Sequence, residues 1–143
     1  MRLVGRVICT MAASEVGVRL GNVRKQIADA VASQGSRPRL VAVSKTKPVE
    51  LLREAYDAGQ RDFGENYVQE LVEKAPQMPD DVCWRFIGNL QSNKAKMLVH
   101  GVPNLAGVET VDTAKLANKL QAAAGPPASS QREAARSGLE AHL

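Results

Sequence analysis

Lys45 is the residue of this sequence best placed to act as a nucleophile. It follows Leu40–Val43, an apolar run without a charge, so the stem of its side chain is anchored beside a predicted core. Partial desolvation there would lower the pKa of the amine and favour its neutral, nucleophilic form. Such an amine can condense with an aldehyde to form an imine. The alternative is a lysine that only extends into solvent at the end of a strand.

The elements that must position Lys45 alternate between helices and strands. Apolar residues at helical spacing predict a first helix over residues 15–33. Short apolar runs then predict strands at 39–44, 61–65, 82–87 and 104–109, each followed by a helix, at 48–58, 67–75, 92–99 and 112–124. Ser92 and Asp112 are the predicted N-caps of the last two helices. One helix followed by four strand–helix units predicts an α/β fold with a parallel sheet.

The apolar run at 39–44 has no polar alternation, which predicts a strand buried on both faces. Ligands of parallel α/β folds bind at the carboxyl ends of the strands. The residues at those ends are Ser44, Lys45, Glu65, Asn66, Gly88, Asn89, Glu109 and Thr110. The short strand–helix repeat suits a barrel better than a Rossmann sheet, and the sequence contains neither a GxGxxG nor a Walker A motif.

Composition and charge exclude several classes of protein. The 143 residues carry a net charge of +4, and the excess of basic residues lies within residues 1–60. These basic residues are scattered singly and do not alternate with aromatic residues, so we do not expect a nucleic-acid partner. No run of about 18 apolar residues occurs, so we expect no membrane-spanning helix.

The two cysteines predict free thiols and not a metal site. Cys9 and Cys83 lack CxxC spacing and have no histidine nearby. Cys83, beside Trp84, is predicted to lie in the core. Two free thiols suit a reducing compartment, so the predicted location is the cytoplasm. His100 and His142 have no partner pattern for catalysis or metal binding, and a structural or solvated role is expected for both.

Three segments are predicted from composition. Residues 1–14 form an N-terminal extension, whose arginines and lack of acidic residues weakly favour a mitochondrial presequence as an alternative. Residues 15–124 hold all the predicted strands and helices. Residues 125–143 begin with a Gly-, Pro- and Ser-rich stretch and carry few large apolar residues, so we expect a mostly disordered tail.

Four motifs resemble those of one known family. They are VAVSKTKP at 41–48, GQRDFGENYVQE at 59–70, WRFIGNLQSNK at 84–94 and, more weakly, ETVD at 109–112. Their order and spacing resemble the pyridoxal phosphate homeostasis family, also called the proline synthetase co-transcribed homologue family. The resemblance spans roughly residues 15–122.

The resemblance implies a TIM barrel like the N-terminal domain of alanine racemase, of which this chain would hold about four βα units. It implies that the protein binds pyridoxal 5′-phosphate as an imine on the lysine of VAVSKTKP, here Lys45. The implied role is to hold and hand over the cofactor within intracellular vitamin B6 homeostasis, without an established enzymatic reaction. Asn66 is the next expected pocket residue, near the cofactor ring; its alternative role is the N-cap of the helix at 67–75.

The sequence departs from the family pattern in three respects. Arg85 stands where the family has a histidine after Trp84, so a permanent cation would replace a titratable ring. The resemblance ends near Ala122, whereas a TIM barrel takes about 250 residues. The second half of such a barrel would carry the phosphate-binding loops. The open edges of a partial sheet lead us to expect self-association.

Two other functions stay open. A racemase- or decarboxylase-like enzyme would need a second acid–base group facing the cofactor, and the strand-end residues named above include no tyrosine or histidine. We therefore expect a binding protein and not an enzyme. The remaining alternative is an inactive fragment or isoform that does not bind the cofactor.

Overall fold

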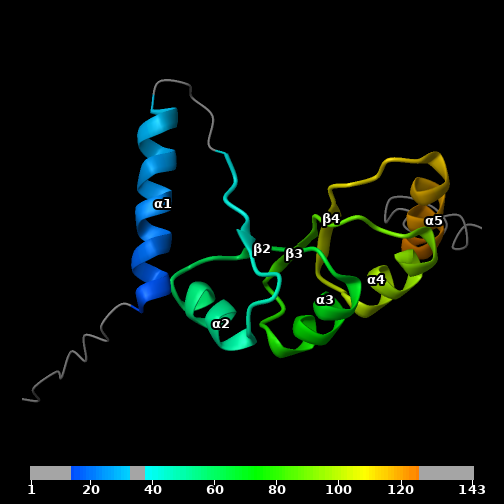
Figure 1. The fold of residues 1–143 in the computed structure, drawn as a ribbon, viewed down its shortest axis with the longest axis horizontal. Helices are drawn as coiled ribbons and strands as arrows, with labels where there is room; N and C mark the ends of the chain where they lie inside the picture. The colour runs from blue at the N-terminus through cyan, green and yellow to red at the C-terminus, as the bar shows by residue number, and fades with distance from the viewer. Residues whose placement is uncertain (1–13, 33–37, 126–143) are drawn as a thin grey trace, which may run out of the picture.

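Helices and strands alternate along the chain in the order that the sequence predicts (Figure 1). A computed structural model describes residues 14–32 and 38–125. The elements are α1 (Glu15–Val31), β1 (Ala42–Val43), α2 (Val49–Asp57), β2 (Asp62–Glu65), α3 (Val68–Lys74), the 3₁₀ turn η1 (Ala75–Gln77), β3 (Cys83–Phe86), the 3₁₀ turn η2 (Ser92–Lys94), α4 (Ala95–Gly101), β4 (Leu105–Val108) and α5 (Ala114–Ala124).

The strands form one parallel sheet in the order β1-β2-β3-β4. Phe63 of β2 lies opposite Ala42 of β1 and Trp84 of β3, and Trp84 lies opposite Leu105 of β4. The register shifts by one residue between Trp84 and Arg85, where β3 pairs with β4. The parallel α/β fold is confirmed, and four consecutive strand–helix units in sequential order are what a partial barrel requires.

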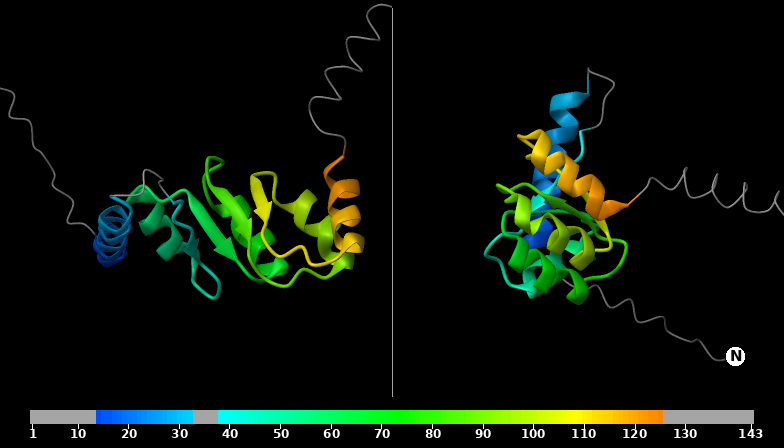
Figure 2. Two further views of the ribbon diagram at one scale, coloured as in Figure 1. Left: turned by 90° about the horizontal axis from the view of Figure 1, so that it is seen from above. Right: turned by 90° about the vertical axis from the view of Figure 1, so that its right-hand side faces the viewer.

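The core lies between the sheet and the helices on one of its faces. Helices α2, α3 and α4 lie along this face, while α1 stands at the β1 end and α5 at the β4 end (Figures 1 and 2). The rings of Phe63 and Trp84 meet with centroids 5.8 Å apart. Leu71 of α3 and Leu98 of α4 are fully buried against them. The strand side chains that point the other way include Asp62 and Arg85, which form an ion pair on the face without helices.

The first strand differs from its prediction. It contains only Ala42 and Val43, and Val43 is 54% exposed. A strand buried on both faces needs a covering layer on each face, and in the described part of the chain Val43 pairs with Gly64 on the face that the helices leave open. Cys83 is likewise only half-buried, because it begins β3 at the rim of the sheet and not in the core.

Two predicted caps were wrong. Ser92 does not cap a helix: it begins the 3₁₀ turn η2, which precedes α4 and has no side-chain cap. Thr113, and not Asp112, caps α5, because its Oγ1 accepts a hydrogen bond from the amide of Leu116 (3.2 Å). Ser14 is the N-cap of α1, because its Oγ accepts a hydrogen bond from the amide of Gly17 (3.1 Å). This residue therefore belongs to the first helix and not to the predicted extension before it.

Helix α1 packs loosely on the rest of the chain. None of its residues is buried, and Val23 of the predicted apolar stripe is 40% exposed. Among the described residues, no helix has the length and hydropathy needed to cross a membrane. The predicted extension up to residue 13, the tail beyond Gly125, and with them Cys9 and His142, lie outside the described residues.

Candidate functional site

Lys45 lies in a tight turn directly after β1. The amide of Lys47 donates to the carbonyl of Ser44 (3.1 Å) and closes the turn, with Lys45 and Thr46 at its centre. Thr46 has φ +60°, a left-handed conformation that is rare for a β-branched residue. Lys45 itself is exposed, so the expected desolvation of its amine was wrong: the apolar run ends one residue too early to enclose it.

Ser44 ties this turn to the second strand. It is 3% exposed, its amide donates to the carbonyl of Gly64 (2.9 Å) and its hydroxyl donates to Oε1 of Glu65 (2.7 Å). Its carbonyl accepts a further hydrogen bond from Nζ of Lys74 on α3 (2.8 Å). The residue before Lys45 is therefore fixed through both backbone and side chain.

Three charged side chains lie beneath the turn. Nζ of Lys74 lies 2.8 Å from Oε1 of Glu65 and 2.6 Å from Oε1 of Glu70. The side chains of Glu65 and Lys74 are 0% and 8% exposed. Oε2 of Glu65 is buried and has no partner among the described residues. Sequence reasoning named Glu65 as a strand-end residue but missed Lys74 and Glu70, whose spacing of four on one helix was the available signal.

Asn66 follows the neighbouring strand, so it shares the carboxyl edge of the sheet with Lys45. Its Oδ1 is buried without a partner in the described part of the chain. It lines a hollow of about 250 Å³ together with Asn89 and Gln91, but Lys45 is not among the residues of that hollow. The N-cap of α3 is Tyr67, which makes no side-chain cap bond, so the alternative role of Asn66 as a cap was wrong.

Gly88 holds the backbone of Asn66 at close range. A Cβ at Gly88 would lie 2.0 Å from the carbonyl oxygen of Asn66, a distance that no side chain tolerates. The hydroxyl of Thr110 donates to the carbonyl of Gly88. The loops after β2, β3 and β4 therefore contact one another at the carboxyl edge of the sheet.

Arg85 lies on the face of the sheet that the helices leave open. Its Nε contacts Oδ1 of Asp62 (3.1 Å), and another guanidinium nitrogen contacts Oε1 of Glu109 (2.7 Å). The hydrogen bonds from Glu109 and Asp62 raise the pKa of the guanidinium, which keeps Arg85 charged. In a closed barrel this face points inward, and here the cation of Arg85 is balanced by two carboxylates.

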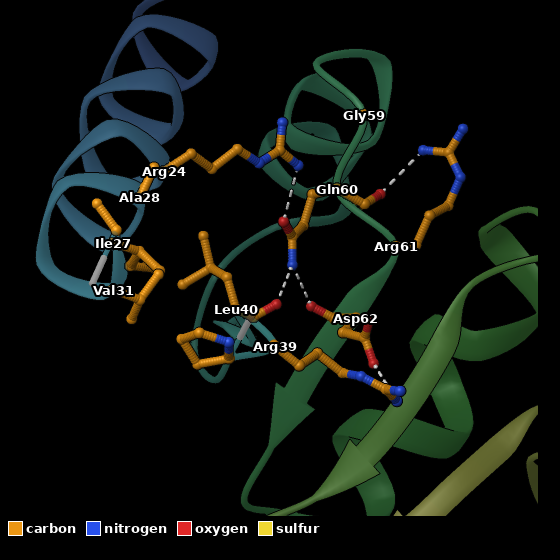
Figure 3. A pocket seen from close by; sticks show the side chains of 12 residues that line it. Arg24, Ile27, Ala28, Val31, Arg39, Leu40, Gly59, Gln60, Arg61 and Asp62 are labelled. Carbon is orange, nitrogen blue, oxygen red and sulfur yellow. Dashed lines mark hydrogen bonds and ion pairs between the residues drawn. The ribbon is translucent and has the colours of Figure 1, made fainter. Parts of the chain in front are cut away.

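A hollow of about 650 Å³ lies at the opposite end of the strands, between α1 and the segments that lead into β1 and β2 (Figure 3). Arg24 crosses from α1 to donate to Oε1 of Gln60 (3.0 Å), and Nε2 of Gln60 donates to the carbonyls of Leu40 (2.8 Å) and Asp62 (2.7 Å). Gln60 therefore uses its amide to join α1, β1 and β2. These contacts are structural and lie away from Lys45.

The carboxyl edge suits a small polar aldehyde in part. An exposed amine and a buried amide oxygen without a partner among the described residues lie after adjacent strands of the sheet. In the described ranges, the structure contains no group of three or more His, Cys, Asp or Glu residues that could hold a metal ion. The edge therefore offers covalent and hydrogen-bonding contacts to a ligand.

Comparisons with known proteins find a group of curated relatives that share one name. No family model matches the sequence. The chain is 52% identical over 101 residues to a pyridoxal phosphate homeostasis protein of Schizosaccharomyces pombe, covering 71% of this chain and 41% of that protein. It is 48% identical over 118 residues to the protein of the same name from Bos taurus, covering 76% and 43%. The chain thus spans less than half the length of these curated relatives.

Two solved structures resemble the fold. PipY of Synechococcus elongatus, in a structure with PLP bound, has a TM-score of 0.62 and 39% identity, and the match covers 74% of this chain and 46% of that one. A protein of unknown function from Bifidobacterium adolescentis has a TM-score of 0.64 and 28% identity, with 96% and 56% covered.

Proposed function

The chain is a homologue of the pyridoxal phosphate homeostasis proteins, and on this basis we propose that it binds pyridoxal 5′-phosphate through Lys45. The proposed role is to hold the cofactor for intracellular vitamin B6 homeostasis. The observation that carries the proposal is the placement of Lys45, in a fixed turn at the carboxyl edge of a parallel sheet. This is the edge at which βα folds bind their ligands.

The residues at the carboxyl edge would make different contacts with the cofactor. The cofactor supplies an aldehyde, which condenses with a neutral amine and releases one water. Lys45 offers a primary amine on an exposed side chain. Asn66 offers a polar contact from the next strand, through the amide whose Oδ1 is buried without a partner among the described residues. The ion pairs of Arg85 with Asp62 and Glu109 hold the charges of the open face in place.

We propose binding without turnover. A racemase or decarboxylase needs an acid–base group that is free to face the cofactor. Two carboxylates lie at the strand ends, and both are held in ion pairs, Glu65 with Lys74 and Glu109 with Arg85. These pairings favour a binding role over an enzymatic one.

The free thiol of Cys83 favours a reducing compartment, and the proposed location of the protein is the cytoplasm.

The visible absorption spectrum of the full chain with added pyridoxal phosphate tests this function. Wild type and Lys47→Ala, which removes an exposed lysine two residues away, should both gain the absorption band of the attached cofactor. Lys45→Ala should not. Borohydride reduction followed by peptide mass mapping should place the adduct on Lys45. A band that survives in Lys45→Ala would refute the assignment of Lys45 as the attachment site. If wild type gains no band, the chain is an inactive fragment that does not bind the cofactor. Turnover of an amino acid would support the alternative of a racemase- or decarboxylase-like enzyme.

A further inference from the structure

Two residues of α3 hold the turn that carries Lys45 at two separate points. Oε1 of Glu70 accepts a hydrogen bond from the amide of Thr46 (2.6 Å). One helical turn later, Nζ of Lys74 donates to the carbonyl of Ser44 (2.8 Å). These two points lie immediately before and immediately after Lys45 in the chain. The helix therefore restrains the backbone on both sides of the proposed binding lysine.

The ammonium group of Lys74 has no capacity left for a ligand. A lysine ammonium has three donors, and here they contact the carbonyl of Ser44, Oε1 of Glu65 and Oε1 of Glu70. With its side chain 8% exposed, this lysine is a buried support. The two lysines at this edge thus differ in role: the side chain of Lys45 is exposed to solvent, and that of Lys74 is hydrogen-bonded to the turn.

The turn needs such support because of the backbone of Thr46. A φ of +60° is unfavourable for a β-branched side chain, and such a conformation persists only where the surroundings impose it. The bond from the Thr46 amide to Glu70 exists only while the peptide unit points that amide toward α3. Loss of Glu70 removes this reason for the amide to face the helix.

We propose that Glu70 and Lys74 are positioning residues, which keep the turn at residues 44–47 in its left-handed form and thereby aim the Lys45 amine at the carboxyl edge. The inference rests on the proposed binding role of Lys45. It adds that the attachment depends on a charged pair in the following βα unit, which itself touches no ligand.

The rate of cofactor attachment to the full chain tests the proposal. Glu70→Ala should slow attachment by about tenfold or more, since an unrestrained turn samples many orientations of the amine. Glu70→Gln keeps an oxygen that can accept the hydrogen bond from the Thr46 amide, so its rate of attachment should fall less. Glu73→Ala is the matched control: Glu73 lies on the exposed side of the same helix, where it accepts from Gln69 (2.9 Å), and its loss should leave the rate unchanged.

A second substitution separates positioning from general stability. Glycine adopts positive φ without the penalty of a side chain. Adding Thr46→Gly to Glu70→Ala should therefore restore part of the lost rate if Glu70 acts on this backbone conformation. Equal rates for wild type and Glu70→Ala, or no recovery in the double variant at a matched melting temperature, would overturn the proposal.

Amide hydrogen exchange makes the test independent of cofactor binding. The amide of Thr46 should exchange at least about tenfold faster in Glu70→Ala than in wild type, and no faster in Glu73→Ala. If the variants differ from wild type in this way but wild type never attaches the cofactor, the proposed function fails while the restraint of the turn by Glu70 stands. Unchanged exchange at Thr46 overturns the restraint itself.

Discussion

The carbonyl oxygen of Ser44 accepts a hydrogen bond from Nζ of Lys74, a residue that lies 30 positions later in the chain. This contact joins the end of the first strand to the end of the helix that follows the second. It places a buried charge beneath the exposed amine of Lys45. The carboxyl edge of the sheet is thus built from contacts between neighbouring βα units, and the first two predictions below test two of them.

The first prediction concerns the buried pair of Lys74 and Glu65. Lys74→Met removes the ammonium and leaves the fully buried carboxylate of Glu65 without its counter-charge, so the free energy of unfolding should fall by about 3–5 kcal/mol. Urea denaturation measures the loss. Lys94→Met, at an exposed position, is the control. The double variant Lys74→Met with Glu65→Gln should recover part of the loss, and a single-variant loss below about 1 kcal/mol would contradict the prediction.

The second prediction concerns the contact between Gly88 and Asn66. Gly88→Ala places a Cβ 2.0 Å from the carbonyl oxygen of Asn66, and since that atom belongs to the backbone the two loops must separate. We expect a loss of about 1–3 kcal/mol in the free energy of unfolding, with weaker cofactor binding. Gly21→Ala is the control, because a Cβ there meets nothing within 4 Å on an exposed helix and should leave stability equal or higher. Wild-type stability in Gly88→Ala would be inconsistent with the packing described.

Much of this arrangement was predictable from the sequence, and the rest was not for identifiable reasons. The apolar runs and helix periods predicted the order of elements, and the placement of Lys45 and Asn66 after adjacent strands followed from it. The contacts of Lys74 could not be predicted, because Ser44 lies 30 residues away and a lysine in an amphipathic helix normally faces solvent. The exposure of Val43 also depends on what covers its face of the sheet, and local sequence does not report that.

The third prediction concerns pH. The hydrogen bond from the Tyr56 hydroxyl (2.6 Å), aided by Arg61, lowers the pKa of Asp81 below its usual value of 3.8. A carboxyl group with a lowered folded pKa stabilises the fold above its unfolded pKa, and this contribution is lost as the pH falls through the folded pKa. The stability difference between wild type and Asp81→Asn should therefore be constant above about pH 5 and shrink below about pH 4.

Thermal melts across this pH range measure the effect of Asp81. Tyr56→Phe removes the hydroxyl donor, so the pKa of Asp81 should move back toward its usual value and the stability that is lost on acidification should be smaller. Asp80→Asn, at the neighbouring carboxylate, controls for the change in net charge. A stability difference that stays constant through acidic pH would show that the bond between Tyr56 and Asp81 does not contribute in solution.

The fourth prediction concerns the open edge of the sheet. β1 pairs only with β2 in the described part of the chain, and Val43 at this edge is 54% exposed, so the strand presents unpaired backbone groups and an apolar side chain together. Such edges pair with other chains, and a lysine placed on the edge opposes this because its charge must stay in water. The chain should associate with rising concentration in analytical ultracentrifugation, and Val43→Lys should reduce the association severalfold.

Val111→Lys is the matched control for this test. Val111 is also exposed, at 43%, but it lies in the loop after β4 and not on a strand edge. If association depended on exposed apolar surface in general, both lysine variants would reduce it equally. If it depends on the β1 edge, only Val43→Lys will do so, because only there does the new charge adjoin unpaired backbone groups. A chain that stays monomeric at all concentrations would show that its edge is protected in solution.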